Sequence, residues 1–160
     1  MKRSQPPEPD RRVAALSLAV PTPAGEILLR ASVGAAHPGG PQVLDEHFVV
    51  NADARHEPGW LDCADLLYGS RPRGVSDAVH WLHSITAGRG ACRMAAVPLV
   101  KGGWAVLDTV SRQVTLVPVT MPHGQWLWPS CLLGWLTAGG DLQDLTAARP
   151  AYHSPAEQGG

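Results

Sequence analysis

The sequence has few residues of several kinds. Among its 160 residues are three cysteines, two isoleucines, two lysines and one phenylalanine. Cys63, Cys92 and Cys131 are odd in number, lie far apart and form no CxxC pair, which excludes a disulfide framework and favours reduced thiols in a cytoplasmic protein. Because arginine far outnumbers lysine and alanine is abundant, the composition is of a GC-rich bacterial type. The arginine excess by itself therefore indicates no function.

Long apolar runs are also missing. The longest nearly charge-free stretch, Trp126 to Ala138, has 13 residues and contains a proline and a glycine, whereas a membrane-spanning helix needs about 20 apolar residues. After Lys2 and Arg3, prolines and acidic residues stand where a secretory signal would have its apolar segment. We expect no membrane segment and no secretion by that route.

What the sequence has in excess is glycine and proline, 17 and 15 residues. The formal net charge is only −1, so repulsion between like charges does not keep the chain unfolded. The length is typical of one domain. Residues 1–11 and 147–160 lack apolar periodicity and are predicted to be tails, the C-terminal one mobile, which leaves a single domain at 12–146.

Short alternating runs predict about six strands, and the breaks between them carry much of the glycine and proline. The runs are 16–20, 27–33, 43–51, 94–100, 104–109 and 114–120. The first two flank a Pro/Gly turn and predict an antiparallel hairpin. The last three have links too short for parallel crossovers and predict an antiparallel meander. Pro98 and Pro118 should place their strands at sheet edges or at bulges.

Two segments predict helices. Residues 75–87 place apolar side chains on one face, with Ser76 as the capping residue and Gly88 after the end. Residues 129–137 begin with Pro129, before which Trp128 should be extended, and 61–68 predict at most one helical turn. Clustered strands favour an α+β fold. We predict a single domain with a mostly antiparallel sheet of about six short strands and two helices packed on one face.

The sequence contains none of the local signatures of hydrolases, zinc proteases, nucleotide-binding loops or EF-hands. No cofactor is predicted. The leading hypothesis is a non-enzymatic cytoplasmic protein that acts through protein-protein contact, as an accessory, inhibitor or immunity-type partner, or through self-association as a dimer.

The tryptophan-rich segment supplies the candidate interface for this hypothesis. Its predicted helix has no charged face, so it either forms the central core, the alternative that we favour, or stays partly exposed for a partner. The candidate interface residues are Trp126, Trp128, Leu132 and Trp135.

An enzyme is the second hypothesis, because ionisable groups gather in an irregular segment where catalytic residues are common. The weak candidates there are His56, Glu57, Asp62, Cys63 and Asp65. Cys92 stands between Arg89 and Arg93, neighbours that favour a thiolate. No motif flanks either cysteine.

Two further patterns concern metal binding and anion binding. His80 and His83 have the spacing of metal ligands on a helix, but they lie outside its apolar face and no nearby residue completes a site, so we predict no metal. Residues 66–115 carry a net charge of +4 and the remainder −5. A weak anion-binding or nucleic-acid-binding module is the third hypothesis, and its arginines should cluster around the ends of the 75–87 helix. They are Arg71, Arg73, Arg89 and Arg93.

Overall fold

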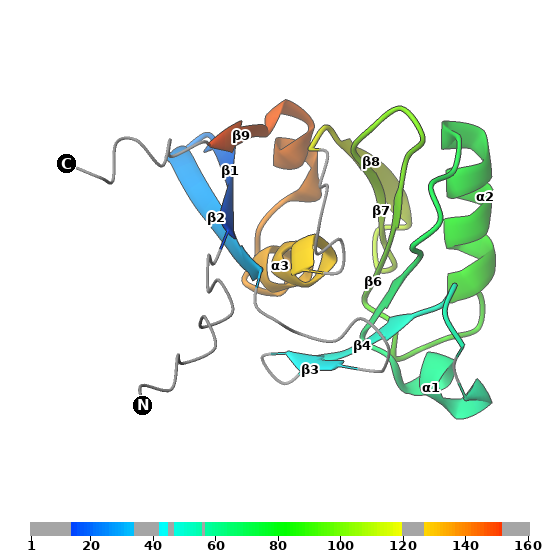
Figure 1. Cartoon of the computed structure of the whole chain (residues 1–160). Helices are drawn as coiled ribbons and strands as arrows, with labels where there is room; N and C mark the ends of the chain where they lie inside the picture. The colour runs from blue at the N-terminus through cyan, green and yellow to red at the C-terminus, as the bar shows by residue number, and fades with distance from the viewer. Residues whose placement is uncertain (1–13, 34–41, 45–46, 56, 120–126, 152–160) are drawn as a thin grey trace, which may run out of the picture.

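The structure is a computed structural model that describes residues 14–33, 42–44, 47–55, 57–119 and 127–151. The predicted N-terminal tail, residues 152–160 of the predicted C-terminal tail, His56 and Trp126 lie outside the described residues. Figure 1 shows two sheets that face each other across one helix, with a second helix on the far side of the larger sheet. The predicted α+β fold class is confirmed, but the strands form two sheets where the sequence predicted one.

The larger sheet is mixed and has the order β3-β4-β5-β6-β7-β8. Its strands are β3 (Gln42–Leu44), β4 (His47–Asn51), β5 (Leu66–Tyr68), β6 (Met94–Pro98), β7 (Trp104–Asp108) and β8 (Gln113–Val117). The pairs β4–β5 and β5–β6 are parallel, and the other three pairs are antiparallel. The predicted meander is confirmed as β6-β7-β8.

The smaller sheet has the order β2-β1-β9 and is antiparallel throughout. Its strands are β1 (Ala14–Thr22), β2 (Gly25–Val33) and β9 (Arg149–Ala151). A two-residue turn joins β1 to β2, and Gly25 closes it with a φ of 119° that favours glycine. The predicted hairpin is confirmed, but β9 lies where the sequence predicted a mobile tail.

The helices are α1 (Pro58–Cys63), α2 (Val75–Thr86), α3 (Leu127–Thr137) and the 3-10 helix η1 (Leu142–Ala147). Both predicted helices are confirmed as α2 and α3. The predicted cap of α2 is wrong, since its N-cap is Gly74 and no side chain caps it. Trp128 is helical rather than extended, because α3 begins at Leu127 and a proline in the first turn of a helix costs no hydrogen bond.

The prediction that both helices pack on one face of the sheet is wrong. Strand β6 is buried over its whole length, and its residues alternate between two cores: Met94 and Ala96 belong to the core that contains α3, whereas Ala95 and Val97 belong to the core that contains α2. The two parallel crossovers place α1 and α2 on one face of the sheet. The second face is then covered by α3, η1 and the smaller sheet.

The 61–68 segment and Pro98 also differ from expectation. The segment divides into the end of α1 and the buried strand β5, which is too short to show a period. Strand β6 is central, so Pro98 is not on an edge strand. It is the last residue of β6, and its carbonyl accepts a hydrogen bond from the Arg73 amide at 3.0 Å.

Among the described residues, no helix combines the length and the apolar character needed to cross a membrane.

Replacing Leu132 tests whether α3 is a core helix or an exposed interface. Leu132 is 1% exposed, so Leu132→Ala should lower the free energy of unfolding by roughly 2–5 kcal/mol, since it leaves a cavity between the two sheets. Urea denaturation measures the change. The control Val100→Ala, at a residue that is 63% exposed, should change stability by about 0.5 kcal/mol or less. Equal effects of the two variants would contradict the buried position of α3.

Candidate functional site

The candidate interface on α3 lies in the core. Trp128 and Leu132 are buried, and both belong to the core between the two sheets. Trp135 is half-buried, its Nε1 donates to the Asp141 carbonyl at 3.1 Å, and its ring lies so close to Gly140 that a Cβ there would meet it at 2.2 Å. In this fold Trp128 and Leu132 are therefore not available to a partner.

The ionisable segment before β5 is engaged in structural bonds. The Asp65 carboxylate accepts the Phe48 amide at 2.7 Å and thereby ties the start of β4 to the start of β5. Asp62 is exposed and pairs with Arg89. Cys63 is exposed, and Glu57 is the N-cap of α1, without a side-chain cap bond. The two bonded carboxylates thus serve different parts of the fold rather than the Cys63 thiol.

Arg73 is held at the carboxyl end of the parallel strands. Its guanidinium donates two hydrogen bonds to Asp53, at 3.0 and 2.8 Å, and lies 4.4 Å from the ring centre of Trp81. The same carboxylate accepts the backbone amides of Ser70 and Arg71. Burial by itself would raise the pKa of Asp53, but the Arg73 guanidinium and these amides outweigh it and hold the pKa below its ordinary value.

The four candidate arginines do not form one patch. Arg71 and Arg73 precede α2, whereas Arg89 and Arg93 follow it, and a helix of 12 residues is about 18 Å long. Arg73, Arg89 and Arg93 each pair with a carboxylate. Their charges are therefore partly neutralised before any anion arrives.

His80 and His83, the pair with metal-like spacing, have no further metal ligands near them among the described residues. His80 is exposed and His83 is half-buried on α2. In the part of the chain that the structure describes, no three His, Cys, Asp or Glu residues lie close enough together to hold a metal ion.

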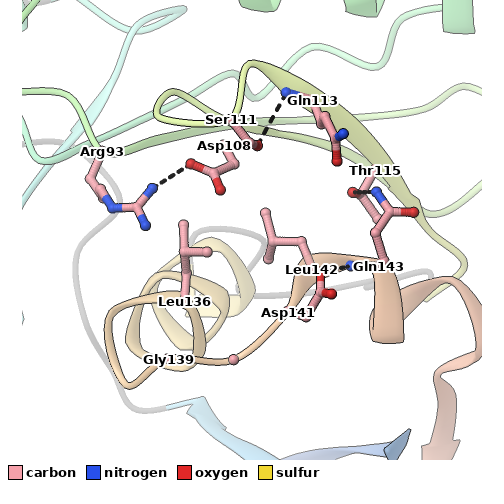
Figure 2. A pocket seen from close by; sticks show the side chains of 11 residues that line it. Arg93, Asp108, Ser111, Gln113, Thr115, Leu136, Gly139, Asp141, Leu142 and Gln143 are labelled. Carbon is pink, nitrogen blue, oxygen red and sulfur yellow. Dashed lines mark hydrogen bonds and ion pairs between the residues drawn. The ribbon is translucent and has the colours of Figure 1, made fainter.

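Two hollows lie on either side of the turn between β7 and β8. The first, which we call the polar hollow, has a volume of about 280 Å³ and lies between the β7–β8 hairpin and the α3–η1 junction. Figure 2 shows its hydrogen-bonded side chains: Arg93 pairs with Asp108, and Gln143 Nε2 donates to Thr115 Oγ1 at 3.0 Å. Asp141 accepts the Gln143 amide at 2.9 Å and caps η1. The bond between Gln143 and Thr115 fastens η1 to the edge strand β8.

Asp108 is a structural carboxylate in this hollow. Burial would raise its pKa, but the Val110 amide, at 2.9 Å, and the Arg93 guanidinium outweigh burial and lower the pKa. It is therefore ionised at neutral pH and positions the turn that follows it.

The second hollow, which we call the basic hollow, has a volume of about 700 Å³ and lies between the end of α2 and the same turn. Its lining includes His83, Arg89, Arg112 and Cys92, and among the described residues it contains no acidic side chain. The structure thus brings three of the sequence candidates together. Sequence reasoning missed Arg112.

The prediction that Cys92 has the most favourable surroundings for a thiolate is wrong. Cys92 is 4% exposed, and burial raises the pKa of its thiol to about 11. Its Sγ donates to the Met94 carbonyl at 3.3 Å. At neutral pH the group is therefore a thiol, which is a poor nucleophile.

The β-strand period explains why one hairpin serves both hollows. Asp108, Gln113 and Thr115 line the polar hollow, whereas Leu107 and Thr109 line the basic one. Successive side chains of a strand point to opposite faces, and the two hollows lie on the two faces of the larger sheet.

Arg112 adopts a backbone conformation that is unusual for its type. Its φ is 61°, and its amide donates to the Asp108 carbonyl at 2.7 Å to close the turn. The left-handed region disfavours residues with a Cβ. Such strain persists where something else requires the residue, which makes the Arg112 side chain a candidate for function.

The chain matches no protein-family model, no curated protein and no solved structure.

Removing the Asp53 carboxylate should weaken the fold in a pH-dependent way. A carboxylate with a lowered pKa in the folded state stabilises the fold above its ordinary pKa, and this contribution is lost as the pH falls through the lowered value. Asp53→Asn should cost about 1–3 kcal/mol at pH 7, and the difference from wild type should shrink below about pH 4. Urea denaturation from pH 7 to pH 3 measures it. Glu57→Gln, at an exposed position, is the control, and a gap that is constant with pH would contradict the role of Asp53.

Replacing Arg112 with glycine should relieve the strained turn. Glycine reaches a positive φ without steric cost, so Arg112→Gly should raise the free energy of unfolding by about 0.5–1 kcal/mol. The control Val110→Gly, at a neighbouring turn residue outside the left-handed region, should lower it instead. Chemical denaturation of both variants decides the point, and a destabilised Arg112→Gly would show that the side chain stabilises the turn.

Proposed function

We propose that this protein is a non-enzymatic binding module that acts through protein-protein contact, and that the basic hollow receives an acidic segment of the partner. The observation that carries the proposal is one hollow whose described lining combines cationic and apolar side chains and has no acidic one. A reducing, cytoplasmic setting is part of the proposal, because all three cysteines are unpaired.

The charge of the hollow supports an anionic partner. Arg89 and Arg112 contribute two positive charges, and only Arg89 has a carboxylate partner, Asp62, which is exposed and outside the lining. No ion pair within the described residues includes Arg112. Opposite charges across an interface speed association and fix its register, and salt screens them.

The volume and the surrounding surface support a protein segment as the occupant. A hollow of about 700 Å³ is large enough for several side chains. Val110, in its lining, is 74% exposed, and Leu116, on the edge strand β8, is 43% exposed. Exposed apolar groups beside a charged hollow are typical of protein interfaces.

The chemistry of the hollow argues against the enzyme hypothesis. Cys92 and His83 line the same hollow, but the Cys92 thiol is buried and donates its hydrogen bond to a backbone carbonyl. Catalysis by cysteine needs a thiolate. The hollow therefore favours binding over covalent catalysis.

A charge reversal at Arg112 tests the proposal directly. The probe is a fluorescein-labelled poly-glutamate peptide, and fluorescence anisotropy measures its affinity. Arg112→Glu should weaken binding by about tenfold, because it replaces an attraction by a repulsion inside the hollow. The affinity of the wild type should also fall as salt rises.

The matched control is Lys101→Glu, which changes the net charge equally at an exposed position in the β6–β7 turn. It should change the affinity by less than about twofold. Equal losses in both variants would mean that only net charge matters and would contradict a site. Tighter binding of single-stranded DNA than of the peptide would favour the nucleic-acid hypothesis instead.

A further inference from the structure

Strand β2 is an edge strand with an unpaired side. It is nine residues long and stands at the end of the order β2-β1-β9, so among the described strands it pairs with β1 alone. Proteins usually protect such edges, because the free amides and carbonyls accept another strand. An edge of this length therefore favours pairing with a further strand.

The solvent-facing row of β2 has a distinctive order of side chains. In the hairpin Glu26, Leu28 and Arg30 lie opposite Pro21, Ala19 and Ser17. The alternate residues Leu18, Val20 and Leu29 pack in the core, so the first row faces away from α3. Glu26 and Arg30 are exposed, and Leu28 is 43% exposed. This row therefore has a negative, an apolar and a positive side chain, in that order, at every second residue.

We propose that a second copy of this chain covers the edge, with the two β2 strands antiparallel about a two-fold axis at Leu28. In that register Leu28 lies opposite its own copy, and Glu26 of each chain lies opposite Arg30 of the other. Oppositely charged residues directly across an antiparallel pair stabilise it, and like charges destabilise it. The two pairs are identical by symmetry, as a closed two-fold dimer requires.

The same pattern excludes the competing arrangements. A parallel, in-register pair would place Glu26 opposite Glu26 and Arg30 opposite Arg30. An antiparallel pair centred one residue away would place each charge opposite an apolar or small residue. Only the register about Leu28 satisfies both charges, so the side chains specify the partner strand as well as its direction.

The neighbours of the edge fix its limits. The Cys131 thiol of α3 donates to the Arg30 carbonyl at 3.4 Å. Because α3 reaches the strand at Arg30, the proposed pairing ends there and covers Glu26 to Arg30. Arg149 of β9 already contacts Glu26 at 3.0 Å. The Arg149 side chain is 71% exposed and the Glu26 side chain 50% exposed. A carboxylate can accept hydrogen bonds from two arginines at once.

The product is a continuous sheet with the order β9-β1-β2-β2-β1-β9. It involves neither the basic hollow nor the β7–β8 turn. Failure of this dimer would therefore leave the proposed function intact, and failure of peptide binding would leave the dimer intact.

A charge-swap series tests the register. Sedimentation velocity and light scattering over a concentration series measure the dissociation constant of the wild-type dimer. Glu26→Arg and Arg30→Glu should each raise it by about tenfold or more, because each creates two repulsive pairs across the two-fold axis. The double variant E26R/R30E should restore dimerisation, since it exchanges the charges and keeps them opposite.

Two controls separate this result from a fold defect or from the bond to Arg149. Arg149→Gln breaks the contact to Glu26 within the chain and should leave the dimer unchanged. Circular dichroism should show all variants folded, and hydrogen exchange at the amides of Glu26 to Arg30 should slow as wild-type concentration rises. A wild type that stays monomeric at the highest concentration, or a double variant no better than the singles, overturns the proposal.

Discussion

Strand β6 is the constraint on which the rest of the structure depends, because it is buried on both faces. Its residues alternate between the core that contains α3 and the core that contains α2. A central strand with two apolar faces needs a layer on each side. The parallel crossovers supply one layer, and α3 with η1 and the smaller sheet supplies the other. The places of the two hollows follow from this arrangement, since each opens at an end of one layer.

Electrostatics then decides which cations have a carboxylate partner among the described residues and which do not. The positive charge of residues 66–115 is visible in the sequence, but the fold engages most of the arginines in that segment. Arg73 is fixed between Asp53 and Trp81, and Arg93 pairs with Asp108. Arg112 lies at the end of a turn, lines the basic hollow and has a strained conformation. A count of charge in the sequence cannot distinguish these roles, because a pairing between residues many positions apart is set by tertiary structure.

The sequence predicted those elements that carry a clear local signal. The apolar periodicity at 75–87, the hairpin around the Pro/Gly turn and the meander of 94–120 all correspond to observed elements. Strands β5 and β9 have three residues each, too few to show a period, and pairing with longer neighbours determines them. The candidate site was less predictable: the shared hollow of His83, Arg89 and Cys92 arises because the segment after α2 returns beside β7. Arg112 gives no local signal, as its importance depends on the hairpin turn.

By itself the sequence determined the fold class, the positions of α2 and α3 and most of the strands, because these depend on side-chain period and on glycine and proline at the breaks. It also identified the tryptophan-rich segment as uncharged on every face, and burial in the core is one of the two outcomes that this allows. Only the tertiary structure decided that the two helices lie on opposite faces of the larger sheet and that Cys92 is a buried thiol. It also placed β2 at an edge of the smaller sheet, where β1 is its partner among the described strands. Each of these depends on which segments lie side by side, and that is set by the packing of two apolar faces rather than by any local pattern.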